Sequence, residues 1–498
     1  MWHDDGVYML VGKALAGGHG LVYDGVVGTP PAVKFPPLYP ALLALLWILF
    51  GTIGSVTMAA TVLNVAFLAA AGALFARALY DSAGFSLRTS VVVAGLGFVS
   101  TDLLRTAMVP LSEASFMLLM MGALALWAST SDSEPATKPG GASSHNSLAA
   151  LALILLAAVL TRSVGVALVA AFGVSLIGRR RFAAGALVAL PAGLVTTFWA
   201  RWSAAKSAEI PEGARDLLGP YSSWLADQTV AAPAAFVRGL PSHAGGVAER
   251  AAAIFLPGLA GWPLWLVAVP VGLVAAVGLW HMVRRFPPLG WFTLAYLGML
   301  LLWPYLDRRL VAPIHPALVA AVAMGGSALV TRWRAPVIAR VLFGVAAVWV
   351  ASYSAVTAYR IADGWPTVAY RLRADRLAAS VEALSRTVPP TAIVGAPEFW
   401  AALHLHGGWT VSPSVRFDPR SVDPDAPMWG TADEQIQMWR TAGIDHLLLE
   451  QAGQLHGAAL DQLEDACSGT VFVLAQLRPA LVVRIDWNSN CGITQSGS

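Results

Sequence analysis

Long apolar runs constrain this chain more than any other feature of its sequence. They recur along most of its length and are separated by short loops that carry arginine. A helix needs about 20 apolar residues to cross a hydrocarbon core of about 30 Å. Only 12% of the 498 residues are charged and 57% are hydrophobic, whereas soluble domains have about 25% charged residues. The sequence therefore predicts an all-α polytopic membrane bundle.

Ten runs are long enough to be predicted as spanning helices. They lie at residues 55–78, 88–106, 110–129, 147–161, 163–178, 182–202, 261–283, 287–304, 310–331 and 336–358. If these helices alternate in direction, the cationic loops that mark the cytoplasm fall on one side. These loops contain Arg77, Arg88, Arg179, Arg180, Arg181, Arg284, Arg285, Arg332 and Arg334. The scheme predicts a cell inner (plasma) membrane protein whose extracytoplasmic segments are residues 1–54, 203–260, 305–309 and 359–498.

The N-terminal region tests this topology. Residues Leu38–Phe50 are apolar but too short for a full span, and they are predicted as an interfacial or re-entrant helix. The N-terminus then lies outside with no helix before it. Polar residues follow Met1 at once, which is not the pattern of a cleavable signal peptide. We expect that the natural protein has one more helix upstream and that Met1 is an internal start.

The chain changes character after Tyr359, where just over half of its 29 acidic residues are found. Helical patterns at 365–387 and 431–442 alternate there with short apolar runs at 392–395, 444–449, 470–477 and 480–485, which predicts a small α/β domain. Its two cysteines, Cys467 and Cys491, argue against a zinc cluster and allow one disulfide in an oxidising compartment. The predicted organisation has three parts. They are an external acidic loop with juxtamembrane helices (1–54), a bundle with external loop 203–260 (55–359), and a soluble extracytoplasmic α/β domain (360–498).

Two adjacent carboxylates, Asp4 and Asp5, open an amphipathic stretch that also contains Tyr8. Taken alone, one of them is best explained as a helix N-cap, because aspartate accepts hydrogen bonds from free N–H groups there. The functional alternative is that one ionised carboxylate takes a proton from a substrate hydroxyl. Lys34 poses a similar choice, since it precedes a proline-rich turn. It can snorkel at the membrane surface, or it can bind a lipid phosphate at headgroup height.

Further charges lie at predicted helix ends on the same external face. Arg105 and Glu113 share one short turn, where an ion pair is the plain interpretation. Arg162 separates two apolar stretches, and an intramembrane charge is costly and usually functional. Arg308 and Arg309 lie outside against the positive-inside bias, which favours an anionic ligand, although Asp307 can pair with one of them. Together these groups could activate a hydroxyl while stabilising a departing phosphate.

With these residues in hand, the chain resembles the integral membrane glycosyltransferases of the C superfamily, near the bacterial aminoarabinose and protein O-mannosyl transferase families. Asp4-Asp5-Gly6-Val7-Tyr8 resembles their first external loop, and Lys34–Leu38 resembles a Lys-Pro-Pro-Leu turn with Phe35 inserted. Arg105 and Glu113 match an arginine and an acidic residue at the outer end of a helix pair. Residues 308–313 resemble a late Arg-Tyr-x-x-Pro motif without its tyrosine.

The resemblance implies inverting transfer of a sugar from a polyprenyl-phosphate donor to a hydroxyl on a lipid, polysaccharide or protein. Asp4 would be the general base, and Asp5 would support it or bind a divalent metal. The implied substrate-binding residues are Tyr8, Lys34, Arg105, Glu113, Arg162, Arg308 and Arg309. Family members also begin with a cytoplasmic end and a first helix that delivers the acidic loop outward.

Other function classes fit the charges and the organisation of the sequence less well than glycosyl transfer. The net charge is only +3 and the arginines lie in loops, so nothing indicates a nucleic-acid partner. A transporter or flippase of a lipid-linked sugar would also need external cations, but transporters bind near the midplane of repeated halves, and the sequence shows no such repeat. A membrane scaffold would leave the converging charges unexplained.

Overall fold

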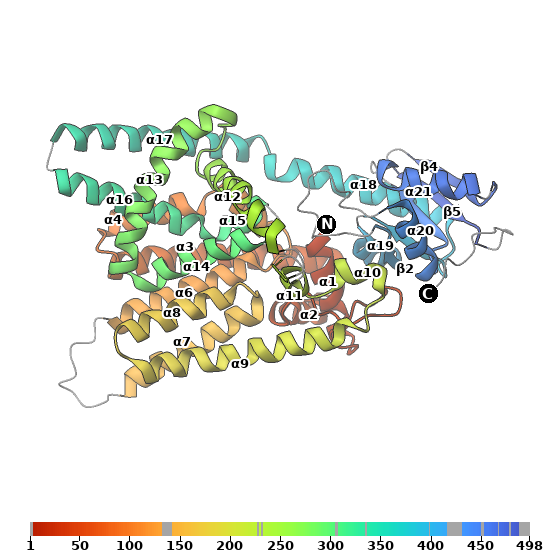
Figure 1. Ribbon diagram of the computed structural model, residues 1–498, viewed down its shortest axis with the longest axis horizontal. Coiled ribbons are helices and arrows are strands. Elements are labelled where there is room, and N and C mark those ends of the chain that lie inside the picture. Colours follow the sequence, from red (N-terminus) through yellow and green to blue (C-terminus); the bar gives the residue numbers. More distant parts are fainter. Residues whose placement is uncertain are drawn as a thin grey trace.

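The computed structural model describes residues 3–131, 142–226, 229–230, 233–303, 307–333, 336–397, 399–415, 431–449, 453–466, 468–477 and 480–487. Long helices form a bundle at one end of the molecule, and a small α/β domain lies at the other (Figure 1). Short helices lie between the bundle and the α/β domain (Figure 1), and several of them line the candidate site.

The bundle contains the predicted apolar segments as helices. They are α3 (Ile53–Ser82), α4 (Leu87–Phe98), α5 (Thr101–Ala107), α6 (Glu113–Ser131), α7 (Ala142–Thr161), α8 (Gly165–Gly178), α9 (Phe182–Ser207), α13 (Gly261–Arg285), α14 (Pro287–Leu302), α15 (Arg308–Val311), a 3-10 turn (Ala312–Ile314), α16 (His315–Trp333) and α17 (Pro336–Ala362). Before them come α1 (His3–Ala16) and α2 (Leu38–Phe50), the latter with the bounds that the sequence predicts.

Not all of these helices are long enough to span a membrane. Within the described residues, five pass a test of length and apolar composition: α3, α9, α13, the stretch Arg308–Arg332, and Gly344–Ala362 in α17. A sixth passes if α4 and α5, bent by 68° at their break, form one span. The apolar stretches Glu113–Trp127 in α6 and Asn146–Thr161 in α7, and the helices α8 and α14, are shorter than the test requires. The structure thus confirms a multi-helix apolar bundle, and the number of ten crossings stays a prediction.

Glycines let α13 and α16 cross in direct backbone contact. A Cβ atom on Gly278 would lie 1.6 Å from the Ala321 carbonyl oxygen, and one on Gly325 would lie 2.0 Å from the Val274 carbonyl oxygen. Because close helix approach drives association inside a bilayer, we expect Gly278→Ala to lower the apparent melting temperature of the protein in detergent. Gly272→Ala in the same helix meets nothing within 4 Å and should leave it unchanged. Equal effects of the two variants would contradict this packing.

The break between α4 and α5 positions the start of α6. The Ser100 hydroxyl caps α5 by accepting a hydrogen bond from the Leu103 N–H at 3.3 Å. The buried Asn64 amide then donates to the carbonyls of Val109 at 2.8 Å and Leu111 at 3.3 Å. These bonds satisfy the backbone of the turn after α5, so that Glu113, the first residue of α6, is held at a fixed place.

Among its described residues, the predicted external loop 203–260 contains the end of α9 and the helices α10 (Glu212–Leu218), α11 (Tyr221–Ala226) and α12 (Pro233–Phe255). α12 contacts α13, α14 and α15 of the bundle. α10 and α11 lie near α1 in the middle of the molecule (Figure 1). This segment therefore forms part of the wall around the acidic N-terminus.

The C-terminal part is an α/β domain, as predicted. Its sheet has the order β2-β1-β3-β5-β4, parallel among β2, β1 and β3 and antiparallel among β3, β5 and β4. The elements are α18 (Trp365–Thr387), β1 (Ile393–Ala396), α19 (Trp400–Gly407), β2 (Thr410–Pro413), α20 (Ala432–Thr441), β3 (His446–Leu449), α21 (Gly453–Ala466), β4 (Val471–Leu477) and β5 (Ala480–Ile485). The sequence did not predict α19, β2 or α21. Cys467 and Cys491 lie outside the described residues, so their pairing stays a prediction.

An N-terminal loop adds a short edge to this sheet. The Val27 N–H donates to the Val411 carbonyl at 3.0 Å, and the Val411 N–H donates to the Gly25 carbonyl at 2.8 Å. Val26 and Val411 are both buried, in a core shared by the N-terminal segment and the α/β domain. The domain therefore holds the loop that leads to Lys34.

Gly25 in this loop leaves no room for a side chain. Its φ is +76°, and a Cβ atom there would lie 2.0 Å from Nδ1 of His404. We expect Gly25→Ala to lower the apparent melting temperature, and His404→Ala in the same chain to restore part of the loss. Gly28→Ala is the matched control, because Gly28 has a similar φ of +74° but nothing within 4 Å. A loss no larger than that of the control would contradict the contact with His404.

Candidate active site

The acidic pair lies in the first turn of α1, where carboxylates suit the helix dipole. The two side chains differ in surroundings. Asp5 is buried, with 1% of its surface exposed, and its Oδ1 accepts a hydrogen bond from the Gly6 N–H at 2.8 Å. Asp4 instead lines a cavity. Of the two, only Asp4 is placed to meet a ligand.

The cavity has a volume of about 360 Å³ and is formed by α1, the Lys34 turn, the start of α6, the α7–α8 junction, α10, α11, α14 and α15. It combines charged groups at one part of its wall with aromatic and aliphatic side chains elsewhere. The polar lining residues are Asp4, Tyr8, Lys34, Glu113, Arg162, Ser163, Tyr221, Tyr296, Asp307 and Arg309. The apolar ones are Phe35, Pro36, Leu111, Val164, Leu217, Met299, Leu300, Trp303 and Leu310.

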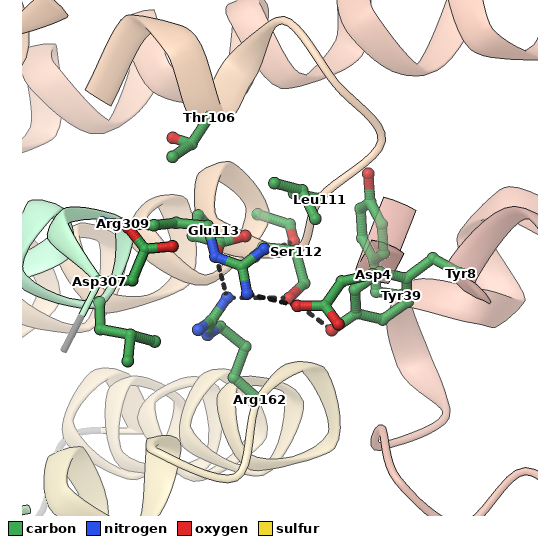
Figure 2. A network of polar contacts seen from close by, with 12 residues as sticks. Asp4, Tyr8, Tyr39, Thr106, Leu111, Ser112, Glu113, Arg162, Asp307 and Arg309 are labelled. Carbon is green, nitrogen blue, oxygen red and sulfur yellow. Dashed lines mark hydrogen bonds and ion pairs between the residues drawn. The ribbon is translucent and has the colours of Figure 1, made fainter. Parts of the chain in front are cut away.

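Two arginines and two carboxylates form a chain of ion pairs in this wall (Figure 2). Nη2 of Arg309 pairs with Oδ2 of Asp4, and Nε of Arg309 lies 3.3 Å from Oε1 of Glu113. Nη1 of Arg162 lies 2.7 Å from the same Glu113 oxygen. Glu113 is 1% exposed, and a buried charge is tolerated when it is paired in this way. The ion pairs therefore connect the four side chains in the order Asp4, Arg309, Glu113, Arg162.

Two hydroxyl groups connect Arg162 of this ion-pair network to Tyr8 in α1. The Tyr8 hydroxyl and the Ser112 hydroxyl are 2.9 Å apart, and Nη1 of Arg162 donates to the Ser112 oxygen at 3.2 Å. Burial raises the pKa of Tyr8 above its ordinary value, partly offset by the Arg162 charge. The Tyr8 phenol therefore stays protonated and can serve as a hydrogen-bond donor or acceptor, not as an anion.

Lys34 is a further cation in the wall of the cavity and is buried, 6% exposed. Its Nζ donates to the Leu217 carbonyl at 3.1 Å and lies 5.3 Å from the ring centre of Tyr221 and 5.6 Å from that of Phe35. Burial lowers the pKa of Lys34, while the Asp4 carboxylate raises it. Cation–π contacts of this kind hold the ammonium group without neutralising it, so it can attract an anion.

Six of the nine predicted site residues line the cavity, and three do not. Asp5 lies in the first turn of α1 and is buried. Arg105 lies on α5, near the buried Asp102. The positive charges of Arg105 and Arg308 both interact with the Asp102 carboxylate. Arg308 lines a second, neighbouring hollow together with Glu249, Arg250 and Asp307. The roles of all nine residues remain predictions.

Several lining residues were not singled out from the sequence. Tyr221 stacks edge-on against Trp303 with ring centres 5.0 Å apart, and the Tyr296 hydroxyl donates to the Leu310 carbonyl at 2.7 Å. Tyr221 lies in an external segment without a motif, and Tyr296 lies in an apolar run. The one available signal was an aromatic residue in a predicted external segment.

A divalent metal at the acidic loop, which the sequence allows as an alternative role for Asp5, stays a prediction. Among the residues that the structure describes, no group of three or more histidine, cysteine, aspartate or glutamate side chains could hold a metal ion. Asp4 pairs with an arginine, and Asp5 does not line the same cavity. We therefore derive no step through a metal.

Comparisons with known proteins show where this architecture has been seen. No protein-family model matches the sequence, and no curated protein matches it significantly. Among solved structures, ArnT from Cupriavidus metallidurans bound to undecaprenyl phosphate superposes with a TM-score of 0.53 at 14% identity, over 96% of this chain and 93% of ArnT. The oligosaccharyltransferase AglB from Archaeoglobus fulgidus superposes with a TM-score of 0.55 at 11% identity, over 98% of this chain and 70% of AglB. The AglB structure is a complex with an inhibitory peptide and a dolichol-phosphate.

The chain shares the overall fold of the membrane glycosyltransferases ArnT and AglB. The similarity covers nearly the whole chain. This confirms the fold expected from the resemblance of short motifs. At such low identity it carries no residue roles.

Proposed function

We propose that this protein is a membrane glycosyltransferase that moves a sugar from a polyprenyl-phosphate donor to a hydroxyl acceptor, with inversion at the anomeric carbon. The observation that carries the proposal is the cavity in which the Asp4 carboxylate lies with Lys34, Arg162 and Arg309. A base and several cations in one enclosed space are what group transfer from a phosphate requires.

The chemistry follows from these residues. Asp4 takes the proton of the acceptor hydroxyl while the hydroxyl oxygen attacks the anomeric carbon. The bond from that carbon to the phosphate oxygen breaks, and its electron pair leaves with the polyprenyl phosphate. Because the attack and the departure occur on opposite faces of the sugar, a single displacement inverts the configuration. Lys34, Arg162 and Arg309 stabilise the charge of the departing phosphate.

The apolar part of the wall suits the lipid of such a donor. Leu217, Met299, Leu300 and Trp303 line the same cavity as the charged network, and pockets for lipid-like ligands are mainly apolar with a few placed polar groups. The structures of ArnT with undecaprenyl phosphate and of AglB with a dolichol-phosphate support the same donor class.

We further propose that the site faces the extracytoplasmic side of the plasma membrane. The distribution of arginines supports this orientation, as well as the assignment of residues 1–54, 55–359 and 360–498 to an acidic loop, a bundle and a soluble extracytoplasmic domain. The acceptor hydroxyl belongs to a lipid, a polysaccharide or a protein, and the inhibitory peptide on AglB is an example of a peptide at a related fold.

Mass analysis of lipid-linked sugars in a strain that lacks the protein tests the proposal in the cell. We expect one polyprenyl-phosphate sugar to accumulate on deletion, and its level to return to normal with the wild-type gene. An unchanged pool of lipid-linked sugars would contradict the function. If purified protein in vesicles moves the lipid-linked sugar across the bilayer without consuming it, the protein is a flippase.

Lys34→Gln tests the proposed donor contact. We expect the KM for the donor to rise by about tenfold or more, because a charge-assisted contact with phosphate is lost. The measurement is the initial rate of transfer in detergent against donor concentration. Lys13→Gln is the control, since Lys13 lies at the other end of α1 and does not line the cavity. A Lys34→Gln enzyme with the wild-type KM would rule out this contact.

A further inference from the structure

Arg309 contacts two carboxylates through different nitrogens. Its Nη2 pairs with Asp4, the proposed base, while its Nε faces Glu113 at 3.3 Å. Glu113 is itself fixed, because it is buried at the start of α6 and pairs with Arg162 at 2.7 Å. One end of the guanidinium is therefore held by a fixed anion, and the other end by a group whose charge changes during the proposed reaction.

The charges around the cavity balance before the reaction. Three carboxylates and three cations line it: Asp4, Glu113, Asp307, Lys34, Arg162 and Arg309. Proton uptake would neutralise Asp4 and leave the wall with one excess positive charge. In the same step the lipid phosphate would gain negative charge, from the single charge of a phosphodiester toward the two charges of a monoester. The negative charge that Asp4 loses therefore equals the negative charge that the lipid phosphate gains.

We propose that Arg309 transfers its Nη2 contact from Asp4 to the departing lipid phosphate as Asp4 takes the acceptor proton. This inference rests on the proposed function. The acceptor O–H proton goes to Asp4, the acceptor oxygen forms the bond to the anomeric carbon, and the electron pair of the broken bond stays on the phosphate. Arg309 pivots on Glu113 and so links the two charge changes.

The same arrangement gives Arg309 a role that differs from that of Lys34. In the resting site Arg309 is engaged by Asp4, so it contributes little to holding the intact donor. It becomes available to the phosphate when Asp4 loses its charge. Arg309→Gln should therefore lower kcat by a larger factor than it raises the KM for the donor, whereas Lys34→Gln should act mainly on that KM.

The decisive experiment measures binding of undecaprenyl phosphate to purified full-length protein in detergent. Asp4→Asn mimics the neutral base, and we expect it to tighten binding by about tenfold, since Arg309 is released to the phosphate. The same substitution in an Arg309→Gln background should give no tightening. Asp24→Asn is the control, because Asp24 lies in the same N-terminal segment but does not line the cavity, and it should leave affinity unchanged.

The possible results separate the inference from the proposed function. Equal tightening with and without Arg309, or no tightening by Asp4→Asn in a protein that binds undecaprenyl phosphate and transfers sugar, would overturn the role of Arg309 alone. A wild-type protein that neither binds undecaprenyl phosphate nor transfers sugar would overturn the proposed function together with this inference.

Discussion

Asp4→Asn lowers the rate of sugar transfer by about 10²–10⁴-fold, the usual contribution of a positioned acid or base. The substitution keeps the size of the side chain, but it removes the charge that accepts the proton and that pairs with Arg309. The measurement is the single-turnover rate with saturating donor and acceptor, because that rate reports the chemical step and not binding.

Two variants serve as controls for this result. Asp24→Asn, outside the cavity, should transfer sugar at the wild-type rate. Asp5→Asn should reduce transfer less than Asp4→Asn does, because Asp5 is buried and does not line the cavity. If Asp5→Asn abolished transfer and Asp4→Asn left it intact, the assignment of the base to Asp4 would be wrong.

Glu113→Gln has the largest expected effect on stability. Glu113 is 1% exposed and faces two arginines, and removal of one partner of a buried ion pair costs about 3–5 kcal/mol because it leaves a buried charge uncompensated. We expect a clear drop in the apparent melting temperature in detergent, together with loss of transfer. Removing one cation as well, in Glu113→Gln/Arg162→Met, should recover part of the stability but none of the activity.

The exposed pair of Glu382 and Arg386 in α18 provides the matched control. Both side chains are more than half exposed, and such surface pairs contribute about 0–1 kcal/mol. Glu382→Gln should therefore leave the melting temperature nearly unchanged. A Glu113→Gln protein as stable as this control would show that the buried network does not stabilise the bundle.

The sequence predicted the helices well because the lengths of apolar runs have a direct physical meaning in a bilayer. The helix at Leu38–Phe50 and the helix at Trp365–Thr387 have the bounds expected from their patterns. The number of membrane crossings was harder to predict from the sequence than the positions of the helices. Helices such as α8 and α14 are apolar but shorter than a spanning test requires, so composition alone does not decide whether they cross. β2 (Thr410–Pro413) was missed because Val411 stands between polar residues and a proline follows, so the strand contains no apolar run.

The site could be predicted only in part, since the sequence gives charges but not their partners. Asp4 alone looks like a helix-start residue, and its contact with Arg309 joins positions 305 residues apart. Arg308 and Arg309 are adjacent in the sequence, yet only Arg309 reaches the main cavity, and Arg308 lines its neighbour. Asp307 was the alternative partner for one of these arginines. Its side chain accepts a hydrogen bond from the Arg309 backbone N–H at 2.9 Å.

The central claim is tested most directly by full-length protein reconstituted in vesicles with the polyprenyl-phosphate sugar that accumulates in the deletion strain. The measurement is the product itself, the new glycoside and the released polyprenyl phosphate, with the anomeric configuration read by NMR. We predict one polyprenyl phosphate released for each glycoside formed, with inverted configuration, and formation of this product about 10²–10⁴-fold more slowly with Asp4→Asn. Retained configuration would contradict the single displacement, and intact donor in the presence of active acceptor would contradict the claim that this protein is a glycosyltransferase.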